Sequence, residues 1–163
     1  MTAHPSAPRR SAAEQRALDD ALTDLFERKI SFNRMLGLKV LTFGFGGPQL
    51  RFEMRPELVG HYLHGRLHGG VISATLDAIA GLAIMAALGE KHADESAEQI
   101  MQRFARLGTI DLRIDYLRPG IGRFSVASAG ILRLGGRVGS AQMRLVNDEE
   151  RLIATGAASY MLS

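Results

Sequence analysis

The sequence predicts an α+β domain in which one antiparallel six-stranded sheet curls around a long buried helix, with an extra helix at the N-terminus. The first observation is residues 71–88, VISATLDAIAGLAIMAAL, where Asp77 is the only charged residue. This segment is too long for a strand and is rich in residues that helices favour or tolerate. The second observation is a set of alternating segments separated by tight turns, which pair antiparallel. Because the helix is apolar on every side, the sheet has to curl around it.

The overall composition is that of one globular domain. The chain has 163 residues, of which 46% are hydrophobic and 23% are charged, and this length is enough for a substantial core. It contains no cysteine, which excludes disulfides, thiolate catalysis and cysteine-ligated metals. The formal charge of +3 is small for a nucleic-acid-binding protein, and no basic cluster is interleaved with aromatic residues. We therefore expect no nucleic-acid partner.

The N-terminal residues and the apolar segment each invite a targeting interpretation. Residues 1–12 have no apolar signal-peptide core, and we predict a disordered tail ahead of a single domain, residues 13–163. Residues 71–88 approach the length of a membrane span, but Asp77 near their middle would cost about 2.5–3.5 kcal/mol on insertion. We therefore interpret the segment as a core helix, expect no membrane span, and expect a cytoplasmic protein.

The first elements along the chain are a helix and a hairpin. Residues 11–30 have apolar positions at helical spacing and begin with a Ser-x-x-Glu pattern that resembles a capping box. Residues 39–45 and 49–54 alternate in polarity on either side of a Gly-Gly-Pro turn, which indicates two paired strands. Residues 55–66 are rich in glycine, histidine and proline, and we expect an irregular loop that leads to the central helix.

Four more strands are predicted after the central helix. Residues 98–107 can form a short amphipathic helix or an ordered loop. Residues 109–117 alternate strictly, and this pattern puts four apolar side chains on one face of a strand: Ile110, Leu112, Ile114 and Tyr116. The remaining strands are separated by a Gly-Gly turn and a polar turn, and they comprise residues 123–134, 137–146 and 151–161.

This order of elements is the hotdog architecture. One sheet of this size wraps most of the central helix and leaves part of it uncovered. We therefore expect a homo-oligomer to complete the burial.

The start of the central helix offers backbone donors to a ligand. Leu67 and His68 are followed by Gly69 and Gly70 at the first helical turn, where N–H groups lack intrahelical partners and the macrodipole is positive. Glycines let a ligand approach the backbone closely, so a carbonyl oxygen placed there would be polarised and an oxyanion stabilised. The alternative is that the glycines only permit a tight turn into a buried helix.

Asp77 favours the functional interpretation of this region. A carboxylate inside an apolar helix is costly unless it is paired, protonated or wetted by a cleft. Ser73, Asp77 and Gly81 are spaced by four and so share one helix face, where Gly81 leaves room for another element of the chain or for an acyl ligand. A structural carboxylate, bonded to a neighbouring backbone group or to an arginine, is the alternative. We favour the functional carboxylate because buried titratable groups gather at active sites.

The run LHGGVISATLDAIAGLA, residues 67–83, resembles the active-site helix of hotdog-fold thioesterases of the PaaI-like group. In that family a His-Gly-Gly opens the central helix, and an acidic residue nine positions after the histidine does the chemistry, as His68 and Asp77 are spaced here. The motifs FNRMLGL, LHGGV, GTIDLRIDYLRPG and a C-terminal Tyr-Met are similar to those of a bacterial subgroup of medium- and long-chain acyl-CoA thioesterases. Together they extend from residue 32 to the C-terminus.

The resemblance implies roles for four residues. Asp77 would be the general base that activates water, or the nucleophile that attacks the thioester carbonyl. The Gly69 N–H would hold the thioester oxygen, and His68 would orient the thioester or the start of the helix. Thr109 occupies a position where relatives place a Ser or Thr that positions the water, across a dimer interface.

Further residues are expected to contact the substrate. The family often has an asparagine a few residues before the His-Gly-Gly, and this chain has His61 and His64 in that loop instead, so we expect one of them to substitute. Arg118 would contact a CoA phosphate, although a solvated arginine is the alternative. Gly70 and Ser73, at the start of the central helix, are the other residues expected to contact the substrate.

The combined prediction is an acyl-CoA thioesterase that releases CoA and a medium- or long-chain fatty acid, or an aryl acid. We expect a dimer or a dimer of dimers with active sites at the dimer interface. No cofactor is expected, because a thioester needs only a base, an oxyanion partner and an acyl pocket. No metal is expected either, because the histidines lack metal-ligand spacing. The alternatives are a hotdog 3-hydroxyacyl-thioester dehydratase, which the His68–Asp77 spacing disfavours, and a non-catalytic acyl-CoA-binding or regulatory hotdog protein.

Overall fold

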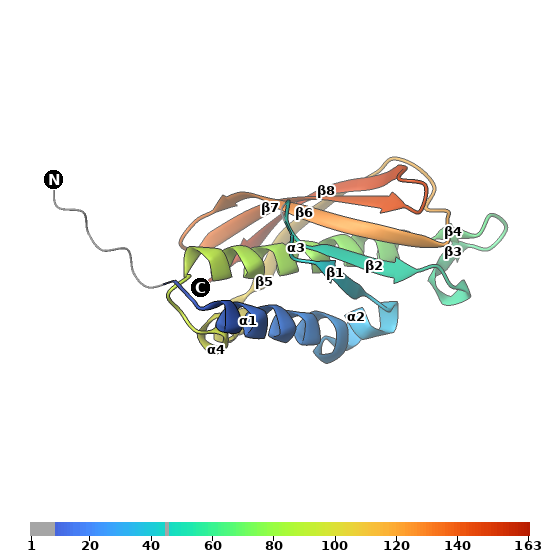
Figure 1. Ribbon diagram of the computed structural model, residues 1–163. Coiled ribbons are helices and arrows are strands. Elements are labelled where there is room, and N and C mark those ends of the chain that lie inside the picture. Colours follow the sequence, from blue (N-terminus) through green and yellow to red (C-terminus); the bar gives the residue numbers. More distant parts are fainter. Residues whose placement is uncertain (1–8, 45) are drawn as a thin grey trace, which may run out of the picture.

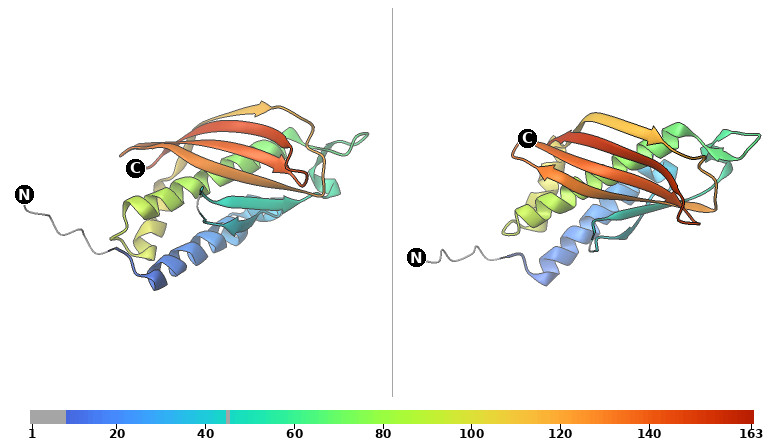
Figure 2. Two further views of the ribbon diagram at one scale, coloured as in Figure 1. Left: turned by 45° about the horizontal axis from the view of Figure 1, so that its top comes forward. Right: turned by 90° about the horizontal axis from the view of Figure 1, so that it is seen from above.

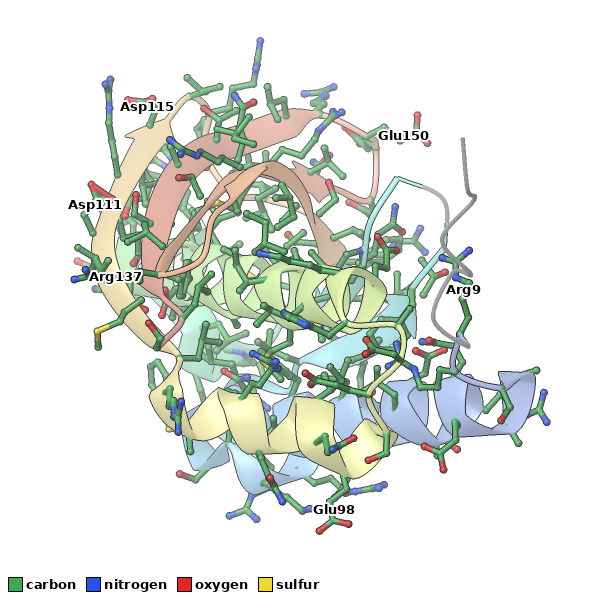
Figure 3. The ribbon with its side chains drawn as sticks, turned by 90° about the vertical axis from the view of Figure 1, so that its left-hand side faces the viewer. Arg9, Glu98, Asp111, Asp115, Arg137 and Glu150 are labelled. Atoms are coloured by element: carbon green, nitrogen blue, oxygen red, sulfur yellow. The ribbon has the colours of Figure 1, made fainter. Side chains whose placement is uncertain are left out.

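A computed structural model describes residues 9–44 and 46–163 and confirms the α+β hotdog fold (Figure 1). Six antiparallel strands form one sheet in the order β1-β2-β6-β7-β8-β5. Their bounds are β1 (Lys39–Thr42), β2 (Gln49–Glu53), β5 (Gly108–Tyr116), β6 (Phe124–Leu134), β7 (Val138–Asn147) and β8 (Leu152–Met161). Seen from one end, the sheet curls around the central helix (Figure 3). Phe45, at the end of the first predicted strand, lies outside the described residues.

The central helix α3 (Gly69–Lys91) lies between the sheet and a second layer of helices (Figure 1). It begins two residues before, and ends three residues after, the predicted segment 71–88. Most of its apolar side chains are buried, because both layers pack on it. The helix is long and apolar enough to cross a membrane by length and composition, but in this fold it serves as the core.

The N-terminal segment forms three helical pieces, of which the first two make up the helix predicted over residues 11–30 and the third follows it. They are α1 (Ala12–Asp24), a π-helical turn (Leu25–Lys29) and α2 (Ser31–Leu36). The π turn ends where Ile30 adopts an extended ψ of 101° while its N–H donates to the Leu25 carbonyl at 3.0 Å. Leu25 and Phe26 are both buried, and they continue the apolar stripe of Leu18 and Leu22 at helical spacing.

The start of α1 is tied to the chain beyond α3. The Ser11 hydroxyl accepts from the Glu14 N–H at 3.2 Å, as the predicted cap requires. The Glu14 carboxylate accepts from the Ala97 N–H at the start of α4 (Ala97–Gln102). Residues 1–8 of the predicted tail lie outside the described residues, and Arg10 donates to the carbonyls of Gly89 and Glu95.

Two connections are more regular than a loop. The segment after α3 forms α4 and a 3₁₀ turn (Arg103–Arg106), so the short helix was the correct alternative for residues 98–107. The segment over residues 55–66, predicted to be irregular, contains a 3₁₀ turn (Pro56–Leu58) and a small hairpin of β3 (Val59–His61) and β4 (Arg66–Leu67). This hairpin extends from the main sheet near the start of α3 (Figure 2).

Candidate active site

Asp77 lies in the third turn of α3, and one of its carboxylate oxygens is held by two hydroxyl groups. Thr109 Oγ1 donates to Asp77 Oδ1 at 3.0 Å, and the Tyr160 hydroxyl donates to the same oxygen at 2.6 Å. The Tyr160 hydroxyl also lies 2.8 Å from the Asp77 backbone oxygen. No described residue donates a hydrogen bond to Asp77 Oδ2. The carboxylate is therefore oriented through one oxygen, and the other keeps its lone pairs for a ligand.

A β-bulge brings Thr109 to this position. Strict alternation from Ile110 would put Thr109 on the outer face of β5 with Asp111. The pairing of β5 with β8 shifts between Thr109 and Asp111, so Ile110 is an extra residue in the strand, and a bulge re-aims the neighbouring side chain. Thr109 turns toward α3, Ile110 is 58% exposed, and Asp111 points outward (Figure 3). The predicted placement of Ile110 on the same face as Leu112 and Ile114 was therefore wrong.

Tyr160 is a site residue that the sequence interpretation missed. It pairs directly with Thr109 across the β5–β8 ladder, so both side chains reach α3 from the same face of the sheet. Burial, with the hydrogen bond to Asp77, raises the pKa of Tyr160 well above its usual range. The hydroxyl therefore stays protonated and remains a donor to Asp77. The only sequence feature that pointed to Tyr160 was the C-terminal Tyr-Met of the family resemblance, which gave it no role.

Asp77 lines a cavity of about 250 Å³ whose other walls are mostly apolar. Small residues of α3 form one side, namely Ala74, Ala78 and Gly81. The N-terminal helices and the 3₁₀ turn before β5 supply larger side chains, among them Phe26, Ile30, Phe32, Phe104 and Leu107. A slot of small helix residues facing larger apolar groups suits an acyl group next to a reactive carboxylate.

The start of α3 is built as a capped helix N-terminus. The His68 Nδ1 accepts from the Gly70 N–H at 2.8 Å, so His68 is the N-cap residue. A Cβ on Gly60 of the β3–β4 hairpin would lie 2.7 Å from the His68 Cα, so this position requires glycine. The Tyr116 hydroxyl donates to the Gly69 carbonyl at 3.1 Å. The Gly69 N–H donates to no atom of the described residues and remains available at the positive end of the helix.

Within one chain the structure does not bring Gly69 and Asp77 to the same point. They are eight residues apart on a continuous helix, which is about 12 Å along the axis at 1.5 Å per residue. Thr109, expected to act across a dimer interface, contacts Asp77 of its own chain. The structure therefore groups Asp77 with Thr109, and His68 with Gly69 and Gly70, at two separate places.

The other predicted residues lie away from the Asp77 cavity. Ser73 donates to the Gly70 carbonyl at 3.2 Å and does not line the cavity. His61 and His64 are exposed on the β3–β4 hairpin, with ring centroids 4.7 Å apart. Arg118 donates to the Leu152 carbonyl at 2.9 Å and borders a different surface cavity, of about 520 Å³. In residues 9–44 and 46–163, no group of three or more His, Cys, Asp or Glu side chains is placed to hold a metal ion.

An antiparallel sheet wrapped around a central helix, with a carboxylate of that helix facing an apolar cavity, defines the chain as a hotdog protein. The sequence model of the thioesterase superfamily matches residues 64–154. The chain belongs to this superfamily. It is 40% identical over 139 residues to the medium/long-chain acyl-CoA thioesterase YigI of Escherichia coli and of Salmonella typhimurium, covering 85% of this chain and 90% of each relative.

Solved structures agree with this assignment. A crystal structure of a Shewanella oneidensis protein related to the thioesterase superfamily is 34% identical, with a TM-score of 0.86, and the match covers 94% of this chain and 99% of that one. A second crystal structure, from Syntrophus aciditrophicus, is 39% identical with a TM-score of 0.83 and covers 93% of this chain and 100% of that one. Both matches include nearly the whole chain.

Proposed function

We propose that this protein hydrolyses a medium- or long-chain fatty acyl-CoA, or an aryl acyl-CoA, to the free acid and CoA. The observation that carries the proposal is the Asp77 carboxylate, held through one oxygen by Thr109 and Tyr160 and facing a mostly apolar cavity. A relative of 40% identity is named for this activity on medium and long chains. The cytoplasmic location expected from the sequence stays a prediction.

In the proposed mechanism, Asp77 Oδ2 takes a proton from water or attacks the thioester carbonyl itself. Thr109 and Tyr160 orient the carboxylate through its Oδ1. The Gly69 N–H, at the positive end of α3, holds the carbonyl oxygen as it becomes an oxyanion. His68 supports this donor by capping the helix through the Gly70 N–H.

The 12 Å between Gly69 and Asp77 along one helix supports a site made by two copies of the chain. One copy would supply Asp77 and the other the Gly69 N–H. The edge strand β5 is suited to the contact, because its apolar side chains Ile110 and Tyr116 are 58% and 55% exposed. A two-fold dimer brings the same edge from both copies together, and a dimer of dimers extends the same proposal.

The CoA part of the bound substrate would extend from the site to the protein surface. Arg118 borders a cavity with Arg123 and Arg151, and guanidinium groups bind phosphate as paired donors. Arg123 already pairs with Asp148, so Arg118 is a better candidate than Arg123 for contact with a CoA phosphate. His61 and His64, on the exposed hairpin, would reach the substrate of a neighbouring copy rather than the Asp77 of their own chain.

The test measures free-thiol release from a panel of acyl-CoAs, from butyryl-CoA to stearoyl-CoA with benzoyl-CoA and phenylacetyl-CoA. Wild type should release thiol, and Asp77→Asn should lower kcat by about 100- to 10,000-fold, as expected for a lost general base. Asp20→Asn, on the exposed face of α1, is the matched control and should keep full activity. A wild-type protein that binds acyl-CoA but releases no thiol would instead be a non-catalytic binding protein.

A further inference from the structure

Asn33 is a buried amide without a partner. It lies on α2 with only 5% of its surface exposed, and it lines the cavity that contains Asp77. No described residue forms a hydrogen bond with its side chain, although its backbone oxygen accepts from the Leu38 N–H. The only other buried asparagine among the described residues is Asn147, whose side chain makes three hydrogen bonds to backbone groups.

An unpaired amide in such a place needs a partner from outside the chain. The amide is open to the cavity and is not one of the sealed, unpartnered polar atoms of the described residues. A ligand that displaces water from the cavity must replace the hydrogen bonds of that water, because a donor or acceptor left without them is unfavourable. The rest of the cavity is mostly apolar and suits an acyl chain. An acyl chain has no polar atom that could form a hydrogen bond with Asn33. The polar atoms of the reaction itself are the thioester carbonyl and the attacking water. Asn33 is therefore placed to meet one of these two.

We propose that Asn33 Oδ1 and Asp77 Oδ2 together hold the two hydrogens of the hydrolytic water, a role that rests on the thioesterase function proposed above. Two acceptors facing one cavity suit water, which donates two hydrogen bonds and keeps a lone pair for attack. Asp77 Oδ1 is already occupied by Thr109 and Tyr160, so Oδ2 is the oxygen available for this contact.

The step balances as a simple hydrolysis. The water oxygen bonds to the thioester carbon while one water proton passes to Asp77 Oδ2 and the other stays hydrogen-bonded to Asn33 Oδ1. The carbon–sulfur bond then breaks, its electron pair leaves on the CoA sulfur, and the proton from Asp77 converts that sulfur to the thiol. The carboxylic acid and CoA are the products.

The first test is Asn33→Leu, which removes both polar groups and keeps the shape. We expect kcat to fall by about 10- to 100-fold with KM unchanged, because only the transition-state contact is lost. The melting temperature should change little, because the Asn33 side chain makes no hydrogen bond to a described residue that the substitution would remove. Asn147→Leu is the matched control, and it should lower the melting temperature while leaving kcat unchanged.

The second test is Asn33→Asp, which keeps an acceptor oxygen and adds a charge. It should retain more activity than Asn33→Leu, and the acidic limb of its kcat–pH profile should move to higher pH, because a second carboxylate next to Asp77 raises their pKa values. Binding of an acyl-CoA ketone analogue, in which a methylene replaces the sulfur, should be the same in wild type and Asn33→Leu.

Three results would overturn the water-holding role. One is full kcat in Asn33→Leu, and another is an unshifted pH profile in Asn33→Asp. The third is weaker binding of the ketone analogue by Asn33→Leu, which would show that the amide holds the carbonyl instead. If wild type itself releases no thiol from any acyl-CoA, the thioesterase proposal fails, and that failure is separate from these three.

Discussion

At the scale of single residues, the site depends on how one carboxylate is held. Thr109 and Tyr160 both donate to the same oxygen of Asp77. This arrangement fixes the direction of the carboxylate and leaves the second oxygen for the reaction. Among the described residues these two hydroxyl groups are the only side-chain donors to the Asp77 carboxylate.

Tyr160→Phe should lower kcat by about 10-fold, because it removes the shorter of the two hydrogen bonds to Asp77. It should also change how stability depends on pH. Because the pKa of Tyr160 is raised in the folded protein, its stabilising contribution is present at pH values below the unfolded pKa of about 10 and is lost as pH rises above it.

Urea unfolding between pH 8 and pH 11, conditions that bracket this unfolded pKa of about 10, measures the effect. Wild type should lose stability toward the alkaline end, and Tyr160→Phe should lose less. Tyr62→Phe, at the exposed tip of the β3–β4 hairpin, is the control and should match wild type. Equal alkaline loss in Tyr160→Phe and wild type would contradict the coupling.

At the scale of elements, the N-terminal helices form one wall of the cavity that contains Asp77. Phe26 projects from the π-helical turn and packs edge-on against Phe104, with ring centroids 6.1 Å apart and planes at 71°. A Cβ on Gly81 would lie 3.7 Å from the Phe26 ring, so the ring closes on the helix at this point. Both Phe26 and Gly81 line the cavity, so their contact closes its wall between the π turn and α3.

Phe26→Leu should open this wall and move the acyl-chain preference toward longer chains. A smaller side chain removes the closed contact with Gly81, and each additional buried methylene then contributes about 0.8 kcal/mol to binding. The measurement is kcat/KM across the acyl-CoA panel, normalised to the preferred chain of wild type.

Leu22→Ala is the control for this element. Leu22 is buried in α1, one turn before Phe26, and does not line the cavity. Its truncation should cost about 2–5 kcal/mol of unfolding free energy and leave the order of chain preference unchanged. If both variants shift the preference alike, the change reflects a loosened helix and not the position of Phe26.

At the scale of the whole molecule, the length of α3 decides how the site is completed. Gly69 and Asp77 lie on one rigid helix, about 12 Å apart along it, so one chain cannot apply both to a single carbonyl. A dimer resolves this separation if the helix N-terminus of each copy approaches Asp77 of the other. Each dimer then contains two sites, and each site uses both chains.

Mixing two inactive variants tests this arrangement. Gly69→Pro removes the N–H, and proline suits this first helical position because His68 before it is extended, with ψ 137°. Gly69→Pro and Asp77→Asn should each be inactive alone. Refolded together in equal amounts, they should recover about a quarter of wild-type activity, because half of the dimers are mixed and half of their sites carry no substitution.

Gly69→Ala controls for the change of side chain, since it keeps the N–H and should remain active. Its Cβ would lie 3.5 Å from the Tyr116 ring, an ordinary contact. No recovery in the mixture, with dimers shown by light scattering, would mean that Gly69 and Asp77 do not act in one shared site.

The sequence by itself determined the layers of this protein and the residue at the centre of its candidate site. A long apolar segment with one carboxylate predicted the core helix and Asp77, and period-two alternation with tight turns predicted six antiparallel strands. These features rest on neighbours along the chain, so local periodicity and turn chemistry are enough to predict them. The His-Gly-Gly before the helix likewise predicted an N-terminus with an available backbone donor.

Only the tertiary structure decided which side chains surround Asp77. Tyr160 is 83 residues away in sequence and Thr109 is 32 away, and Thr109 reaches Asp77 only because a bulge interrupts the alternation of β5. Asn33 lines the cavity from α2, a short helix that the sequence did not predict. Each of these placements depends on packing between distant segments, and such contacts leave no periodic pattern in the sequence.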